Sequence, residues 1–269
     1  MGVPYAEVIG DPIAHSKSPI IHQFWLRQMK IIGEYKAVRI RPAQLGDYLG
    51  DRRRDPNWRG CNVTMPLKEP VSAHVDDIDP VARRIGAVNT VINHSTGLLI
   101  GTNTDFQGAH FALSGVPSTG RKVVLLGAGG AARAVLEELR QAKAAHVTIL
   151  NRDRDKARKL LGESGLPGET GPLGGAPAAD LLINATCLGM AGQPALDIDL
   201  SALHPGATVF DLVYHPLETP LLAQARRRGF RVVDGVTMLV MQASMAFTYF
   251  FGEPPPEADS AELRELLFR

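Results

Sequence analysis

The chain of 269 residues has little cysteine, few aromatic residues and almost no net charge. Its two cysteines, Cys61 and Cys187, cannot form a disulfide framework, so we interpret each as a small buried side chain in a reducing compartment. Lys and Arg number 29 against 28 Asp and Glu, and aromatic residues make up 6%. Because nucleic-acid binding needs a basic surface and often aromatic stacking platforms, the composition gives no case for a nucleic-acid partner.

Long apolar runs and metal-ligand clusters are also missing. The N-terminus has no basic region followed by an apolar one, which argues against a signal peptide. The uncharged stretch 235–252 falls short of the roughly 20 apolar residues of a membrane span and contains Gln242 and Ser244. We therefore predict a buried, functional helix there, no membrane partner and a cytoplasmic protein. No His, Cys, Asp or Glu cluster has metal-site spacing, so no metal is predicted.

Glycine, in contrast, is abundant: 27 residues, about 10% of the chain against an average of about 7%. The glycines have no three-residue period, which excludes a collagen-like chain. A hydrophobic content of 45% with a net charge of +1 excludes disorder. The excess therefore needs a local explanation.

Strand-like and helix-like segments alternate along the chain. In the first hundred residues we predict strands at 5–9, 35–41 and 61–63, helices at 19–30 and 44–53, and a hairpin at 88–101. A helix at 106–113 precedes strands alternating with helices, the pattern of βαβ units and a parallel sheet. The Gly- and Pro-rich segment 163–179 is predicted as a loop, and 260–268 as a terminal helix.

This pattern predicts an α/β protein of two domains. Residues 1–104, with 237–269, would form an N-terminal α/β substrate-binding domain. Residues 105–236 would form a Rossmann-like, doubly wound parallel sheet that binds a dinucleotide. Ligands of such sheets bind outside the carboxyl ends of the strands, where we expect the substrate.

A glycine-rich turn explains part of the glycine excess. The apolar strand 123–126 runs directly into Gly127-Ala128-Gly129-Gly130-Ala131-Ala132 and then into a helix. This order matches the dinucleotide fingerprint G-x-G-x-x-A. Gly127 permits the tight turn, Gly129 the close approach of a pyrophosphate, and Ala132 the packing of helix on strand, while free N–H groups at the helix start face the anion. A merely tight structural turn is the alternative.

The residues after the next strand, 147–150, favour NADP. NAD enzymes usually carry Asp or Glu here for the ribose 2′-hydroxyl, whereas this chain has Asn151 and Arg152. Arginine pairs with a 2′-phosphate in a bidentate manner, and Lys156 adds a second cation. Asp153 puts a negative charge between them. The alternative is a solvated helix start at which Asp153 favours the helix dipole.

Four polar stretches, 10–19, 62–68, 86–90 and 101–105, lie at predicted strand ends. They supply the donors and acceptors that a small polyhydroxylated carboxylate needs: Ser16, Ser18, Asn62, Thr64, Lys68, Asn89, Thr102 and Asp105. Taken singly, such residues equally form caps and turns. Ser18, directly before Pro19, fits a helix N-cap.

In these stretches the chain resembles the shikimate dehydrogenase family, within the shikimate/quinate dehydrogenase superfamily, nearly from end to end. The resemblance rests on GDPIAHSKSP (10–19), NVTMPLK (62–68), GAVNT (86–90), NTD (103–105), GAGGAAR (127–133), NR (151–152), INATCLGM (183–190), DLVYHPLETPLL (211–222) and DGVTMLVMQASMAF (234–247). It implies reversible hydride transfer from NADPH to 3-dehydroshikimate, giving shikimate in aromatic amino-acid biosynthesis.

The resemblance also implies roles for single residues. Lys68 matches the family's catalytic lysine and Asp105 its partner aspartate. Both would touch the substrate, whose other implied ligands are Ser16 and Ser18 for the carboxylate, Thr64, Asn89 and Gln242 for the ring hydroxyls, and Tyr214, which would close the pocket. The implied NADP-binding residues are Gly127, Ala128, Gly129, Gly130, Ala131, Asn151, Arg152, Lys156, Ala185, Thr186, Leu212 and Gly235, the last beside the nicotinamide.

Three positions depart from the family pattern. Asp153 replaces a small hydroxyl residue, Pro80 stands where an acidic residue is frequent, and Cys187 replaces a common serine. Three alternatives stay open: a quinate/shikimate dehydrogenase using NAD or NADP, a dehydrogenase of an aminated shikimate analogue, and a non-catalytic NADPH-sensing regulator. Intact Lys68 and Asp105 argue against the last, because a Lys–Asp pair offers a proton donor and an orienting anion. We expect a monomer or homodimer.

Overall fold

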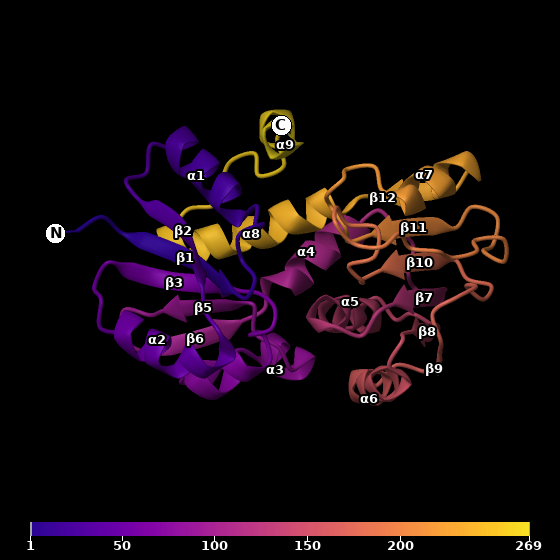
Figure 1. The fold of residues 1–269 in the computed structure, drawn as a ribbon, viewed down its shortest axis with the longest axis horizontal. Helices are drawn as coiled ribbons and strands as arrows, with labels where there is room; N and C mark the ends of the chain where they lie inside the picture. The colour runs from indigo at the N-terminus through magenta and orange to yellow at the C-terminus, as the bar shows by residue number, and fades with distance from the viewer. Residues whose placement is uncertain (1, 269) are drawn as a thin grey trace. The chain divides into compact units, whose positions relative to one another are not determined.

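The computed structural model describes residues 2–268, which divide into two compact units (Figure 1). The first unit extends to Gln107 and adds Val240–Leu267, and the second comprises Gly108–Leu239 together with Phe268. The expected boundaries at 104 and 237 lie close to these divisions. Both connections between the units run inside helices, α4 (Thr104–Leu113) and α8 (Gly235–Phe251).

The first unit is built on a mixed six-stranded sheet in the order β2-β1-β3-β5-β6-β4. Its strands are β1 (Tyr5–Gly10), β2 (Glu34–Arg39), β3 (Trp58–Val63), β4 (Asp77–Ile78), β5 (Thr90–Asn93) and β6 (Leu99–Thr102). β1 is parallel to β2 and β3, whereas β5 is antiparallel to β3 and β6. The antiparallel β5–β6 pair confirms the predicted hairpin.

Helices cover both faces of this sheet, so its strands contribute to two cores (Figure 1). On one face Val8 and Tyr35 share a core with Phe250 of α8, and on the other Ile9 shares a core with Leu45. The helical segments of this unit are α1 (Ser18–Gln28), η1 (Pro42–Gln44), α2 (Leu45–Arg52), η2 (Pro70–His74), α3 (Pro80–Ile85) and α9 (Ala261–Phe268). The alternating strand pattern therefore buries both sides of β1.

The second unit is a six-stranded parallel sheet in the order β12-β11-β10-β7-β8-β9. Its strands are β7 (Lys122–Leu126), β8 (His146–Leu150), β9 (Gly168–Gly171), β10 (Leu181–Asn184), β11 (Thr208–Asp211) and β12 (Arg231–Val233). This is the doubly wound order, with its topological switch point between β7 and β10. The predicted fold class is confirmed.

Alternate residues of β7 enter different cores on the two faces of this sheet. Val123 and Leu125 pack with residues of α5 and α6, and Val124 and Leu126 pack with residues of α7. These helices are α5 (Gly130–Gln141), α6 (Arg154–Ser164) and α7 (Pro220–Arg227). Because both faces of β7 are buried, residues 123–126 of this strand are all apolar.

Two sequence predictions about local structure are wrong. The segment 163–179 is not wholly a loop, because β9 pairs with β8 within it. An edge strand needs only backbone hydrogen bonds from one neighbour, so its side chains give little strand signal. Cys61 is fully buried as expected, but Cys187 is exposed in the turn that follows β10. The segment between Lys68 and Gly86, which was given no elements, forms η2, β4 and α3.

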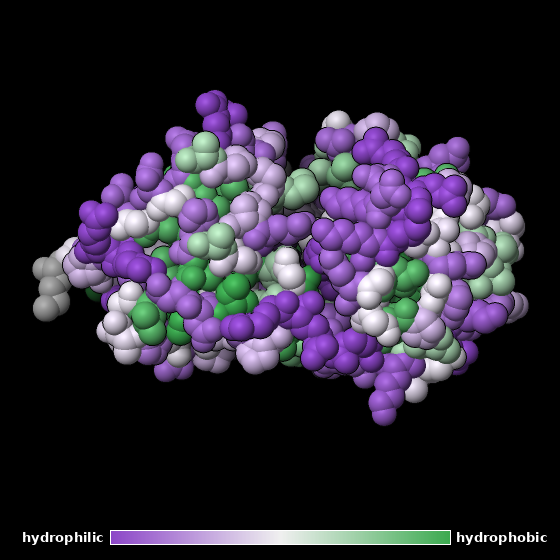
Figure 2. Space-filling model, turned by 90° about the horizontal axis from the view of Figure 1, so that it is seen from below, coloured by the Kyte–Doolittle hydropathy of each residue, from purple (hydrophilic) through white to green (hydrophobic). Residues whose placement is uncertain are grey.

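The uncharged stretch 235–252 forms α8, a helix of 17 residues. Between residues 2 and 268, no helix combines the length and apolar character needed to cross a membrane. On the face shown in Figure 2, hydrophilic and apolar side chains are interspersed within each unit.

A fully buried histidine, His22 of α1, makes the stability of the first unit depend on pH. Its ring stacks on Tyr35 with centroids 3.9 Å apart, and burial lowers the pKa of His22 to about 3. An unfolded histidine has a pKa of about 6.5. Between these two values the unfolded chain binds a proton that the folded chain does not. Stability is therefore complete above about pH 6.5 and falls as the pH drops toward 3.

We expect the free energy of unfolding of the wild type to lose up to about 1.4 kcal/mol per pH unit in this window relative to His22→Phe. Urea titrations at pH 7, 6, 5 and 4 measure it. Both tryptophans, Trp25 and Trp58, lie in the first unit, so their fluorescence reports on that unit alone. If the free energy of unfolding changed equally with pH in the wild type and in His22→Phe, His22 would not be the source of the pH dependence.

Candidate functional site

The predicted catalytic pair, Lys68 and Asp105, is in direct contact. Lys68 lies in the segment after β3, and Asp105 lies in the first turn of α4. Lys68 Nζ donates a hydrogen bond to Asp105 Oδ2 at 2.5 Å. The two side chains are 17% and 10% exposed. The ammonium group is therefore fixed by a carboxylate while it stays within reach of a ligand.

Asn89 holds the other oxygen of the carboxylate. Its Nδ2 donates to Asp105 Oδ1 at 2.8 Å, and its Oδ1 accepts the backbone N–H of Thr104 at 2.7 Å. Because the backbone donor fixes which end of the amide is oxygen, the NH₂ group must face Asp105. Asn89 therefore positions the aspartate, a role that its place at a strand end does not reveal.

Gln242 is brought to the same network from a distant part of the chain. The Thr104 hydroxyl donates to Gln242 Oε1 of α8 at 3.4 Å. Thr104 is fully buried and also accepts from Asn89 Nδ2 at 3.1 Å. The structure thus gathers Lys68, Asp105, Asn89 and Gln242. Thr104 joins them as a residue that motif analysis missed, although it lies inside the NTD motif.

The predicted carboxylate ligands, Ser16 and Ser18, lie between β1 and the first turn of α1. Ser18 N donates to Ser16 Oγ at 3.3 Å. The N-cap of α1 is Lys17, without a side-chain cap, and Ser18 is the first helical residue, so the N-cap interpretation of Ser18 is wrong. Thr64 follows β3, and its N–H donates to the Ile9 carbonyl at 2.9 Å, which aligns the ends of β1 and β3.

In the second unit, the glycine-rich turn lies at the topological switch point. Gly127 follows β7 and has a φ of 99°, which glycine adopts freely. A Cβ atom there would lie 3.0 Å from the carbonyl oxygen of Ala185, the residue after β10. Gly129 is the N-cap of α5 without a side-chain cap, and a Cβ atom on it would meet nothing within 4 Å. The first N–H groups of α5 are therefore available to an anion.

A buried amide–carboxylate pair, which motif analysis missed, holds the turn after β10. Asn184 Oδ1 accepts from Thr186 N at 3.0 Å and from Thr186 Oγ1 at 2.7 Å. Asn184 Nδ2 donates to Asp211 Oδ1 at 2.9 Å, and Thr219 Oγ1 donates to Asp211 Oδ2 at 2.6 Å. Burial raises the pKa of Asp211, and its hydrogen bonds act in the opposite direction. The sequence shows a polar residue at the end of each of these two apolar strands, but their pairing depends on β10 and β11 being neighbours in the sheet.

Leu212 and Gly235, both predicted near the nicotinamide, contact each other at the end of β11. A Cβ atom on Gly235 would overlap the carbonyl oxygen of Leu212. Packing within the protein therefore requires glycine at 235, independently of a cofactor. Tyr214 is half-buried two residues beyond Leu212, and burial raises its pKa.

The residues after β8 have two roles: Asp153 caps a helix, and Arg152 and Lys156 supply positive charge. Asp153 is the N-cap of α6, and its Oδ1 accepts from Lys156 N at 3.0 Å. Asn151 Nδ2 donates to the Asp153 carbonyl at 2.8 Å. Within residues 2–268, no carboxylate forms an ion pair with the side chain of Arg152 or Lys156. Asp153 therefore caps the start of α6, as the alternative interpretation of this segment predicted. The side chains of Arg152 and Lys156 remain available to bind a phosphate.

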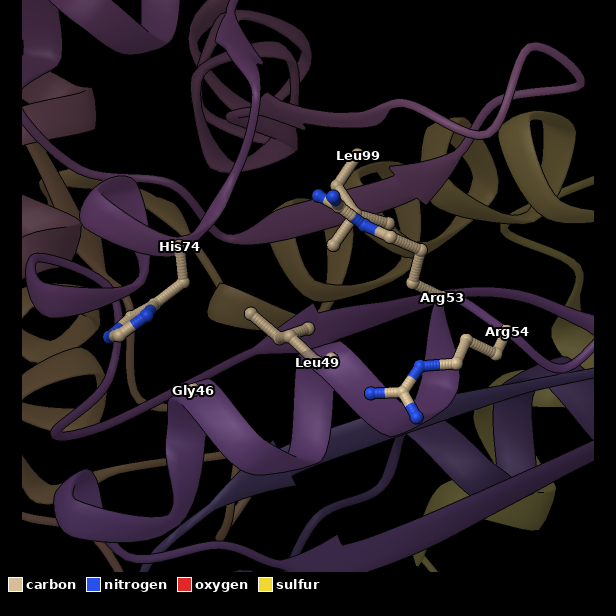
Figure 3. Close-up of a pocket in the computed structure, with 7 residues that line it drawn as sticks. Gly46, Leu49, Arg53, Arg54, His74 and Leu99 are labelled. Atoms are coloured by element: carbon tan, nitrogen blue, oxygen red, sulfur yellow. The ribbon is translucent and has the colours of Figure 1, made fainter.

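A separate cavity of about 390 Å³ in the first unit contains none of the predicted residues. It is lined by Gly46, Leu49, Gly50, Arg53, Arg54, His74 and Leu99 (Figure 3). Arg53 forms an ion pair with Asp76 at 2.6 Å, and Arg54 lies 3.9 Å from Asp51. Because carboxylates already balance both guanidinium groups, this cavity does not form an anion site and is not part of the candidate site.

Each unit matches a protein-family model. Residues 8–91 match the shikimate dehydrogenase substrate binding domain, and residues 111–174 match the shikimate / quinate 5-dehydrogenase domain. The shikimate dehydrogenase (NADP(+)) of Sphingopyxis alaskensis is 52% identical over 265 residues, which cover 98% of this chain and 97% of that protein.

Solved structures show the same fold over almost the full length. Shikimate 5-dehydrogenase from Thermus thermophilus, in complex with NADP(H) and shikimate, has 37% identity and a TM-score of 0.85, with 98% of each chain covered. The ligand-free 5-ketofructose reductase of a Gluconobacter strain has 32% identity and a TM-score of 0.89, with 99% of this chain and 98% of that chain covered. Since 52% of the aligned residues are identical to those of a relative over 98% of this chain, and both units match models of the family, the chain belongs to the shikimate dehydrogenase family.

Proposed function

We propose that the protein is an NADP-dependent shikimate dehydrogenase that interconverts 3-dehydroshikimate and shikimate in aromatic amino-acid biosynthesis. It would act in the cytoplasm as a monomer or homodimer, with the first unit binding the substrate and the second the cofactor. The observation that carries the proposal is the 2.5 Å contact of Lys68 with Asp105, braced by Asn89. The NADP-dependent shikimate dehydrogenases among its relatives support the substrate and the cofactor.

Lys68 is the proton donor of this reaction. Reduction of a ketone needs a hydride at carbon and a proton at oxygen, and bound NADPH supplies the hydride. The Lys68 ammonium carries three protons, of which one is engaged by Asp105, so another is free for the carbonyl oxygen. Asp105 orients the ammonium, and in the oxidation of shikimate the lysine takes the proton back.

The other residues of the first unit bind and orient the substrate. Ser16 and Ser18 hold the carboxylate with their hydroxyl groups. Thr64, Asn89 and Gln242 bind ring hydroxyls, and Tyr214 is a further substrate ligand. Shikimate carries a carboxylate that a ketosugar such as 5-ketofructose lacks, so kinetics with both substrates test this assignment.

The residues of the second unit fit NADP. The uncapped start of α5, with Gly127–Ala131, would hold the pyrophosphate through backbone N–H groups. The 2′-phosphate would bind Arg152, with Asn151 and Lys156 beside it. Ala185, Thr186, Leu212 and Gly235 would line the rest of the cofactor site. The absence of an acidic partner for Arg152 among residues 2–268 supports NADP over NAD.

A matrix of substrates and cofactors tests the function. kcat/KM is measured for shikimate, quinate and an aminated shikimate analogue with NADP⁺ and NAD⁺, and for 5-ketofructose with NADPH. We expect shikimate with NADP⁺ to give the highest value. A higher value for another substrate would reassign the enzyme within the family, and the absence of turnover with every pair would favour a regulator.

Arg152→Ala should abolish most of the preference for NADP. A charge-assisted hydrogen bond contributes about 1.5–3 kcal/mol, so we expect KM for NADP⁺ to rise about 10- to 100-fold while KM for NAD⁺ changes little. Arg158→Ala is the matched control, because Arg158 lies further along α6 in an ion pair with Asp155 at 2.7 Å. Equal losses with both cofactors would show that Arg152 does not recognise the 2′-phosphate.

A further inference from the structure

The hydrogen bonds that hold Asp105 continue from Asn89 into the interior of the first unit. Thr90 Oγ1 donates to Asn89 Oδ1 at 3.0 Å, and Asn62 Nδ2 donates to Thr90 Oγ1 at 3.0 Å. The Tyr35 hydroxyl donates to Asn62 Oδ1 at 2.5 Å. Tyr35 and Thr90 are fully buried, and Asn62 and Asn89 are 6% and 2% exposed. We call Tyr35, Asn62, Thr90 and Asn89 the Tyr35 chain.

Each hydrogen bond of the Tyr35 chain has a fixed direction. Burial raises the pKa of Tyr35 well above its usual value, so its hydroxyl stays protonated and donates. The Asn62 carbonyl oxygen must face this donor, which directs the Asn62 NH₂ group at Thr90. Thr90 accepts from Asn62, and its single proton is left for Asn89 Oδ1. The Tyr35 hydroxyl thus helps to set the direction of a chain that ends on the catalytic carboxylate.

The other end of the chain is the Tyr35 hydroxyl, which belongs to a fully buried residue. Because hydrogen bonds in a buried chain polarise one another, a change at this hydroxyl is transmitted toward Asn89.

We propose that Tyr35 is a positioning residue that supports the Asn89–Asp105 contact through a buried chain of hydrogen bonds. Tyr35 acts through Asn62 and Thr90 and touches none of the reacting groups. The inference rests on the proposed function, since that function gives Asp105 its part in catalysis.

Tyr35→Phe removes the hydroxyl and keeps the ring that stacks on His22. We expect kcat for shikimate oxidation to fall about fivefold, the factor that corresponds to one net hydrogen bond, with KM for NADP⁺ unchanged.

Tyr48→Phe is the matched control. Tyr48 is also a buried tyrosine of the first unit, and its hydroxyl donates to Glu7 at 2.6 Å, outside the Tyr35 chain. This variant loses the same chemical group and a comparable buried hydrogen bond. We expect its kcat per folded molecule to match the wild type.

Thr90 provides a second test of the same chain. Thr90→Val interrupts it and should reproduce the loss seen in Tyr35→Phe, whereas Thr90→Ser keeps the hydroxyl and should restore most of kcat. If the two substitutions acted independently, the fold losses of kcat that each causes would multiply in the double variant. Because both substitutions cut one chain, the Tyr35→Phe/Thr90→Val double variant should be no slower than Thr90→Val alone.

A readout without turnover separates this inference from the proposed function. In ¹⁵N-asparagine-labelled protein, the side-chain amide resonance of Asn89 should shift in Tyr35→Phe and stay in place in Tyr48→Phe. Failure of the wild type to oxidise shikimate would refute the proposed function. The spectrum would still show whether the Tyr35 hydroxyl acts on Asn89. An unmoved Asn89 resonance, or losses of kcat that are equal in the two tyrosine variants, would overturn the inference.

Discussion

Lys68→Met should lower kcat for shikimate oxidation by about 10² or more, the scale of a general acid–base contribution, while NADPH binding should be retained. Methionine keeps most of the side-chain length but cannot donate a proton or pair with Asp105. The loss falls on kcat because the proton moves only in the chemical step. Steady-state kinetics give kcat and KM, and fluorescence titration with NADPH gives the dissociation constant of the cofactor.

Lys36→Met is the control for the loss of a lysine charge from the first unit. Lys36 lies on β2, where it pairs with Glu34 at the surface, and its replacement should leave kcat unchanged. A Lys68→Met enzyme that kept kcat and showed only a raised KM would assign Lys68 to binding instead. Loss of turnover with cofactor binding retained would also argue against the regulator alternative, since a sensor needs the nucleotide site and not the lysine.

Many of the site residues that the sequence predicted lie in short motifs that follow strands. Gly127 follows β7 and Ala185 follows β10, and parallel strands bring their carboxyl ends to one edge of a sheet. Lys68 and Asp105 could be paired because family motifs carried both. Motif position therefore identified these residues without any knowledge of strand register.

The residues that were missed act through buried contacts between separate elements. Asn184 meets Asp211 only because β10 and β11 are neighbours in register, and Tyr35 reaches Asn62 only because β2 and β3 flank β1. A polar residue inside an apolar strand carries no local sign of its partner. The same limit applies to Cys187, which was expected to be buried by its residue type and is exposed by the turn it occupies.

The second large effect concerns stability. Arg52→Ala should lower the free energy of unfolding of the first unit by about 3 kcal/mol, at the low end of the cost of breaking a buried ion pair. Glu7 of β1 is 2% exposed and accepts hydrogen bonds from Arg52 Nε at 2.8 Å, Arg52 Nη2 at 3.0 Å and Tyr48 at 2.6 Å. Without Arg52 the Glu7 carboxylate keeps one neutral donor and no opposite charge. The 32% exposure of Arg52 admits some water and limits the loss.

Arg53 is a control one residue away on the same helix end. Its ion pair with Asp76 joins side chains that are 39% and 31% exposed, so Arg53→Ala should cost less than about 1 kcal/mol. The double variant Glu7→Leu/Arg52→Leu removes both charges together and should be more stable than Arg52→Ala, because no buried carboxylate is left unpaired. Urea unfolding followed by the fluorescence of Trp25 and Trp58 measures all three. If Arg52→Ala cost no more than Arg53→Ala, burial of Glu7 would not govern the stability of this sheet, and the pair would behave as a surface ion pair.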